Sequence, residues 1–244
     1  MAPSDATGSD DTSPWILPTT SFWQRLEPLA DWDGRWAPPW RHGVPVRVRV
    51  GAQTQVLLLP IRALPGAGDR AVASLIANQA SLAVADALTR AMGELAHGLA
   101  PDVVIGLPTL GLVFAPGVAR ALGHARWVPL GYSRKFWYDD ALSTPVESIT
   151  TPGAGKRLYL DPNQWPLVKG RRVLLVDDAV SSAQTLRQVW NLLEALGADV
   201  VGAVVAMCQG DRWRTALGPE RAPKVHGVFD SPLLQRGIDG WRPL

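Results

Sequence analysis

The feature that most constrains the fold is a series of short apolar segments that alternate with helical segments over residues 100–208. Strands that are apolar on both faces are typical of parallel sheets covered by helices on two sides. Helical spacing over residues 111–123 and 182–197, each ending at glycine, supplies the covering helices. The sequence therefore predicts an α/β fold with a doubly wound, mostly parallel sheet, followed by a small C-terminal hood or tail at residues 209–244. The predicted strands are residues 102–107, 125–131, 157–161, 171–178 and 198–207.

The chain before this core is predicted to form an extension over residues 14–99. Residues 1–13 are rich in Ser, Thr, Asp and Gly, which is typical of a disordered tail. VPVRVRV at 44–50 and TQVLLLPIR at 54–62 have the period of strands and predict a hairpin. Residues 69–99 are rich in alanine and leucine at helical spacing, so we expect one long helix or two in tandem.

Tryptophan is abundant in this extension. The prolines between the indoles argue against one long helix, so we expect irregular chain with a short helix near residues 21–30. We predict that the indoles pack onto the body of the protein or form a subunit contact, with base stacking as the less favoured alternative. Five of the eleven tryptophans lie here, namely Trp15, Trp23, Trp32, Trp36 and Trp40.

Composition and charge restrict the class of protein. The chain has 244 residues, is 47% hydrophobic and has a formal net charge of +2, which allows a large core but gives no electrostatic basis for non-specific nucleic-acid binding. The single cysteine, Cys208, cannot form an internal disulfide and suits a reducing compartment. We see neither a signal-peptide pattern nor an apolar run near the roughly 18–20 residues of a membrane helix. We therefore expect a soluble cytoplasmic protein.

Two adjacent acids and a hydroxyl-rich stretch follow the strand at 171–178, in the segment VLLVDDAVSSAQTL. Asp177 and Asp178 should lie at the carboxyl edge of the sheet, where ligands bind in such folds. The following residues lead into a helix, and its first N–H groups can bind an anion. Carboxylates accept hydrogen bonds from sugar hydroxyls, while the loop donates to a phosphate. The segment thus indicates a site for a phosphorylated sugar.

Two other interpretations of this segment are open. The acids could be solvated at a strand end, with Ser182 serving only as the N-cap of the helix. The segment also resembles the start of a response-regulator receiver domain, whose paired acids bind a metal. That family needs an acid at the end of a later strand, and the next strand here ends in VVAMCQG. The receiver alternative is therefore disfavoured.

The segment VLLVDDAVSSAQT also resembles the phosphoribosyl-diphosphate (PRPP) binding motif of type I phosphoribosyltransferases, in particular the purine-type members that act on adenine or xanthine. The acids, the two serines and the closing threonine match, whereas alanine and glutamine stand where the family usually has at least one glycine. The resemblance implies that the loop holds the 5′-phosphate of PRPP. Its residues are Ser181, Ser182, Ala183, Gln184 and Thr185.

Two further stretches agree with this resemblance. DVVIGLPTLG at 102–111 is similar to the family's pyrophosphate loop, with Gly106 and Gly111 suited to a tight turn and a strained peptide often present there. Many members have a basic residue where Leu110 stands. GYSRKFWYDD resembles the purine-type Arg-Lys pair that leads into a mobile lid, here residues 136–156. The implied pyrophosphate ligands are Pro108, Thr109, Leu110, Gly111 and Arg134.

The resemblance implies a glycosyltransferase that moves phosphoribosyl from PRPP to a nucleobase, a purine, in nucleotide salvage. It assigns catalysis to Asp177, Asp178 and Lys135, and it implies Mg²⁺ held by the two acids indirectly, through ribose or water, and a homodimer. The base is expected near the end of the last core strand. The alternative is a non-catalytic relative of the same fold that binds PRPP or a nucleotide and regulates another process. The residues expected near the base are Met207, Cys208, Gln209, Trp213 and Phe229.

Overall fold

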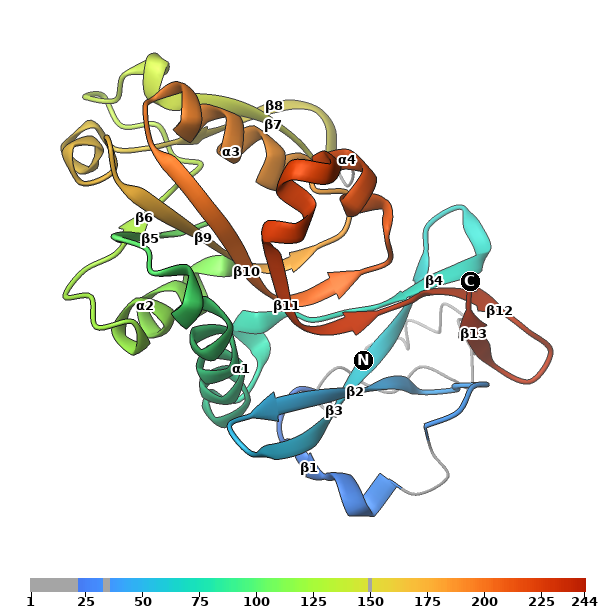
Figure 1. The fold of residues 1–244 in the computed structure, drawn as a ribbon. Coiled ribbons are helices and arrows are strands. Elements are labelled where there is room, and N and C mark those ends of the chain that lie inside the picture. The colour runs from blue at the N-terminus through green and yellow to red at the C-terminus, as the bar shows by residue number, and fades with distance from the viewer. Residues whose placement is uncertain (1–21, 33–35, 149–150) are drawn as a thin grey trace, which may run out of the picture.

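The computed structural model describes residues 22–32, 36–148 and 151–244, so the predicted tail at 1–13 and Trp15 lie outside the described residues. A five-stranded sheet with the order β11-β10-β9-β5-β6 forms the centre of the molecule, and its strand pairs are parallel (Figure 1). This confirms the predicted doubly wound core. The strands are β5 (Val103–Gly106), β6 (Val128–Pro129), β9 (Arg172–Val180), β10 (Asp199–Gln209) and β11 (Val225–Ser231).

Helices cover both faces of this sheet (Figure 1). Successive residues of β9 alternate between two cores, because Leu174 and Val176 pack with α1 and α2 while Val173 and Leu175 pack with α3 and α4. Within the described residues no helix has the length and apolar character needed to cross a membrane. The helices are α1 (Leu82–Ala96), α2 (Gly111–Ala121), α3 (Gln184–Ala195) and α4 (Arg212–Arg221).

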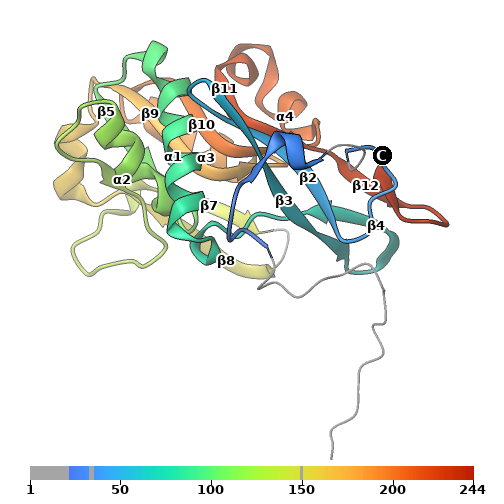
Figure 2. The same ribbon diagram turned by 90° about the horizontal axis from the view of Figure 1, so that it is seen from below.

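A second sheet of six strands forms a hood beside the core, and both ends of the chain contribute to it (Figures 1 and 2). The predicted hairpin is confirmed as β2 and β3, which pair antiparallel. β4 pairs with β3 on one side and with β12 on the other. The strands are β1 (Glu27–Pro28), β2 (Gly43–Val50), β3 (Gln53–Leu64), β4 (Ala67–Ala73), β12 (Leu233–Arg236) and β13 (Trp241–Pro243).

The predicted helix over residues 69–99 is wrong in its first part. The chain there forms β4 and then a 3-10 turn at Ala77–Gln79, and α1 begins only after Ser81, whose Oγ accepts a hydrogen bond from the Val84 N–H at 3.2 Å. Ala71 and Ala73 are buried between two partner strands. Strand pairing on both edges and burial therefore override the helix propensity of alanine.

The C-terminal part and the expected lid also differ from prediction. β11 lies in the parallel sheet, so the α/β core extends past residue 208 to Ser231 and only β12 and β13 join the hood. The expected strand at 125–131 is reduced to the two residues of β6. Within and just after the predicted lid, β7 (Ser143–Ser148) and β8 (Thr151–Tyr159) form an antiparallel hairpin, and the strand predicted at 157–161 belongs in part to β8 and not to the parallel sheet. Residues 149–150 lie outside the described part.

The tryptophans of the extension make contacts within the chain. Trp23 and Trp32 are buried, and their indole N–H groups donate to the Ser74 carbonyl at 3.1 Å and to Glu27 Oε2 at 2.7 Å. Trp40 donates to the carbonyl of Trp36 at 3.1 Å. The short helix expected near 21–30 is a 3-10 turn at Leu29–Trp32. The indoles thus pack onto the protein's own body, as predicted.

Candidate functional site

The acid pair lies near the carboxyl end of β9, with Ala179 and Val180 after it. The Asp178 N–H donates to Asp177 Oδ1 at 2.9 Å. Burial raises the pKa of the Asp177 carboxyl well above its ordinary value, and the Asp178 carboxylate beside it raises that pKa further. Burial also raises the pKa of Asp178. Neither acid has an arginine or lysine partner among the described residues. The site therefore holds two neighbouring buried carboxylates without a basic partner among the described residues.

The loop that resembles a pyrophosphate loop lies directly against the acids. A Cβ atom on Gly111 would stand 2.8 Å from Asp177 Cα and 3.0 Å from Asp177 Oδ1. The Leu107 N–H donates to the Val176 carbonyl at 2.9 Å, and the peptide bond between Pro108 and Thr109 is cis. Because β5 and β9 are neighbours, their carboxyl ends bring together two stretches about 65–70 positions apart in the sequence.

The hydroxyl-rich loop ends at α3. Ala183 is the residue that caps the helix, with φ +58° in the left-handed region and no side-chain capping bond. The prediction of Ser182 as N-cap is therefore wrong, and Ser182 Oγ lies 3.5 Å from the Gln184 nitrogen, at the limit of a hydrogen bond. The first amide groups of α3 thus have no capping side chain of the usual kind and can donate to an anion.

The Arg-Lys pair is not brought to the acids. Arg134 forms an ion pair with Asp140 of its own segment, at 3.1 Å between Nε and Oδ1. The Lys135 side chain is exposed. The assignment of Arg134 to pyrophosphate and of Lys135 to catalysis therefore requires this segment to rearrange, and it stays a prediction.

Tyr132 belongs to the site although the sequence analysis did not select it. Its hydroxyl donates to the Pro108 carbonyl at 3.2 Å, which ties it to the loop before Gly111. Burial raises the pKa of the phenol, and the carboxylates of Asp177 and Asp178 raise it further, so the hydroxyl group lies within electrostatic reach of both acids. Tyr132 immediately follows a predicted strand, and the same strand-end rule that selected the acids would have found it.

The residues expected near the base do not form one pocket. Met207 and Phe229 pack on the α1 and α2 side of the sheet, whereas Cys208 and Trp213 pack on the α3 and α4 side. Gln209 donates its Nε2 to the Ala73 carbonyl at 2.9 Å and so joins β10 to the hood. The base region near the end of β10 stays a prediction, and these residues cannot all line it from one face of the sheet. Burial also raises the pKa of the Cys208 thiol to about 12, so it is no thiolate nucleophile.

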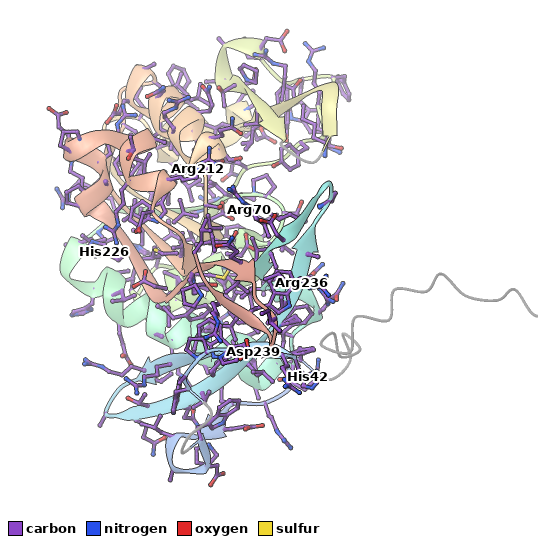
Figure 3. The ribbon with its side chains drawn as sticks, turned by 90° about the vertical axis from the view of Figure 1, so that its right-hand side faces the viewer. His42, Arg70, Arg212, His226, Arg236 and Asp239 are labelled. Atoms are coloured by element: carbon purple, nitrogen blue, oxygen red, sulfur yellow. The ribbon has the colours of Figure 1, made fainter. Side chains whose placement is uncertain are left out.

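The hood presents a basic residue toward the end of β10. Arg70 shares a sheet face with Val72, because the residues alternate along β4, and Val72 stands opposite Leu233. A Cβ atom on Gly210 would lie 3.2 Å from Leu233 Cγ, so this face of the hood points toward the end of β10. Figure 3 shows Arg70 and Arg212, at the start of α4, on the same side of the molecule.

Comparison with known proteins identifies the class. Residues 72–225 match the family described as "Phosphoribosyl transferase domain", which is well over half of the chain. The chain belongs to this family, and its fold is that of the type I phosphoribosyltransferases.

Individual relatives are distant. An orotate phosphoribosyltransferase of Acinetobacter baylyi is 29% identical over 146 residues, covering 57% of this chain and 60% of that protein. An adenine phosphoribosyltransferase of Cutibacterium acnes is 35% identical over 107 residues, covering 43% and 55%. The chain thus spans little more than half the length of these curated relatives. The solved adenine phosphoribosyltransferase of Rhodothermus marinus shares the fold, with a TM-score of 0.54, 19% identity and coverage of 70% and 93%.

Proposed function

We propose that the protein transfers the phosphoribosyl group of PRPP to a nucleobase and releases pyrophosphate. This proposal rests on the close contact between Gly111 and Asp177. The start of α3, which has no side-chain cap, follows the same end of β9. One edge of the sheet thereby offers acceptors for sugar hydroxyls beside donors for phosphate groups. Those are the two chemistries that a phosphorylated sugar bearing pyrophosphate requires.

The roles follow from charge. Asp177 and Asp178 accept hydrogen bonds from the ribose hydroxyls and stabilise positive charge that develops at carbon 1. The start of α3 holds the 5′-phosphate, and residues 108–111 hold the leaving pyrophosphate. A charge-assisted hydrogen bond of this kind contributes roughly 1.5–3 kcal/mol. The bond from carbon 1 to the pyrophosphate oxygen breaks and a bond to a base nitrogen forms, so no protein nucleophile is needed. Positioning and electrostatics supply the catalysis.

A divalent cation fits the acid pair. Mg²⁺ is commonly bound by one or two carboxylates together with substrate phosphates and waters. Asp177 and Asp178 provide two adjacent carboxylates without a basic partner among the described residues, and they would hold the ion indirectly, through ribose or water. Bound Mg²⁺ would neutralise charge on pyrophosphate.

We propose a purine as the acceptor, entering between the hood and the end of β10. The hood face that carries Arg70 points to this region, and Tyr132 is hydrogen-bonded to the Pro108 carbonyl of the loop before Gly111. The relatives include adenine and orotate enzymes by name, so a panel of bases must include both types.

One observation favours the second candidate, a regulator that binds PRPP or a nucleotide without turnover. Ala183 holds a left-handed conformation where the family usually has glycine, and Arg134 is engaged by Asp140. A methyl group therefore stands at the phosphate loop and a basic residue is turned away from the acids. These departures from the family pattern are the reason to test binding separately from turnover.

The test has two stages. Calorimetry measures PRPP binding with Mg²⁺, and a coupled assay then measures pyrophosphate release across adenine, xanthine, hypoxanthine, guanine, orotate and uracil. Binding followed by release with a purine supports the enzyme. Binding with no release on any base supports the regulator, and the absence of binding contradicts both. Light scattering tests the proposed homodimer independently.

A further inference from the structure

A cavity lies at the amino ends of the strands of the parallel sheet, on the edge opposite the acids. Its volume is about 460 Å³, within the usual range for small-molecule sites. Four segments line it: residues 101–103 before and at the start of β5, residues 124–128 between α2 and β6, Pro166 and Leu167 of a 3-10 helix, and Arg171 just before β9. Along β9, Arg172 and Asp177 are separated by roughly 17 Å at about 3.3 Å per residue. The cavity is thus distinct from the candidate active site.

The cavity combines positive charge with apolar surface. Arg126 and Arg171 line it, both are exposed, and neither guanidinium has an ion-pair partner in the part of the chain that the structure describes. The one acid in the lining, Asp102, is engaged, since its Oδ2 accepts the Arg172 N–H at 3.0 Å. Trp127 and Leu167 supply apolar surface. An anion with a flat or apolar body matches this combination.

One residue of the lining, His124, has a buried polar atom, Nε2, without a hydrogen-bond partner among the described residues. Gln164 Oε1 and Trp165 Nε1 are also buried without a hydrogen-bond partner among the described residues. Both residues belong to the 3-10 helix at Pro162–Leu167, which supplies two other residues of the lining. Buried polar groups are nearly always hydrogen-bonded in folded proteins, so the His124 atom indicates a partner that is not part of the chain.

We propose that this cavity binds a small aromatic anion, with a phosphate or carboxylate held by Arg126 and Arg171 and a ring against Trp127, while His124 Nε2 bonds the ligand. A nucleoside monophosphate has this chemistry. The 3-10 helix that borders the cavity directly follows β8 of the hairpin, and Asp161 at its start accepts a hydrogen bond from the Trp137 indole at 3.4 Å. A bound ligand therefore contacts a segment that is continuous with the β7–β8 hairpin.

The ring signals of His124 can be used to detect ligand binding in the cavity. The chain has four histidines, so the ring signals of His124 in a ¹H–¹³C spectrum are assigned by their loss in His124→Gln. Titration with adenosine 5′-monophosphate should move these signals, with saturation, in the wild-type protein and equally in Asp178→Asn. Adenosine and inorganic phosphate, tested separately, should bind at least about tenfold more weakly, because each lacks one half of the recognised chemistry.

The charge requirement is tested by matched double variants. Arg126→Gln with Arg171→Gln should weaken the monophosphate by at least about tenfold. Arg90→Gln with Arg120→Gln removes the same charge from exposed sites on α1 and α2 outside the cavity and should leave the affinity unchanged. Unmoved His124 signals at millimolar monophosphate, or equal affinity in the two double variants, overturns the proposal. Loss of the shift in Asp178→Asn also overturns it, since the signal would then report binding at the acids.

Discussion

The two ends of strand β9 differ in how their charged side chains are paired. At the amino ends, Arg172 pairs with Asp199 at 3.5 Å and donates to the carbonyls of Leu99 and Ala100 at 2.8 and 3.1 Å. At the carboxyl ends, Asp177 and Asp178 lie side by side, and burial raises the pKa of both. β9 therefore has a paired ionised group at its amino end and two carboxylates without a basic partner near its carboxyl end. Two neighbouring buried carboxylates are electrostatically unfavourable, and such arrangements are found at functional sites, where a bound ligand compensates the charge.

The largest expected effect comes from removing one acid at the carboxyl end. Asp178→Asn or Asp177→Asn should lower turnover by roughly 10²-fold or more, because a preorganised charge beside the developing positive charge is lost. Initial rates of pyrophosphate release measure this. Asp199→Asn makes the same change at the amino end, where the carboxylate is exposed and far from the site, and should leave the rate unchanged. Equal rates in the acid-pair variants and in Asp199→Asn would show that the acid pair is not needed for turnover.

The next effect concerns the contact between the two loops. In Gly111→Ala the new methyl group would stand 2.6 Å from the Val176 carbonyl oxygen and 2.8 Å from Asp177 Cα, both backbone atoms that cannot move aside cheaply. We expect a loss of roughly 1–3 kcal/mol in the free energy of unfolding from overpacking. Turnover should fall at least about tenfold through displacement of the acids.

The control for this change is Gly98→Ala, because a Cβ atom there meets nothing within 4 Å. Denaturant unfolding and steady-state rates are measured on both variants. A normal rate in Gly111→Ala would show that the close approach to Asp177 is unimportant for the site.

The sequence predicted most of the core because each apolar segment had to be buried on both faces. It failed at β4, where an alanine-rich stretch joins a sheet with β12, more than 150 positions later. Pairing between such distant segments leaves no local periodicity to detect. The acids were predicted because ligands bind at the carboxyl ends of such strands, and the Gly111 loop was predicted from its resemblance to the family's pyrophosphate loop. The base region near the end of β10 stays a prediction, and Met207 and Cys208 face opposite sides of the sheet because they are successive strand residues.

The third prediction is a gain in the free energy of unfolding when the charge of Asp177 is removed. The pKa of Asp177 is raised in the folded state above its ordinary value of 3.8, so the unfolded chain loses this proton at lower pH. The acid therefore lowers stability progressively as the pH rises through the folded pKa, and the loss is complete above it. Each pKa unit corresponds to about 1.4 kcal/mol. Asp177→Asn should thus be more stable than the wild type at neutral pH, with the difference shrinking toward pH 4.

Urea unfolding at several pH values measures this difference. Asn keeps an Oδ1 that can accept the Asp178 N–H, so the substitution removes the charge and retains the bond. Asp199→Asn should show no such gain, because that carboxylate is exposed and paired with Arg172. A wild type that is more stable than Asp177→Asn at neutral pH would mean that the acid pair is not held at an electrostatic cost.

The smallest expected effect tests the loop between the acids and α3. Ala183 has φ +58°, a conformation that costs L-residues roughly 1–2 kcal/mol and glycine little. Glycine also loses more backbone entropy on folding and gives up a buried methyl group, so Ala183→Gly should raise the free energy of unfolding by no more than about 1 kcal/mol. Removing the methyl group lets a phosphate approach the first amides of α3, so PRPP affinity should rise a few-fold. Ala195→Gly, in the last turn of the same helix, should lower stability and leave affinity unchanged. Weaker PRPP binding in Ala183→Gly would show that the phosphate does not approach α3 at this residue.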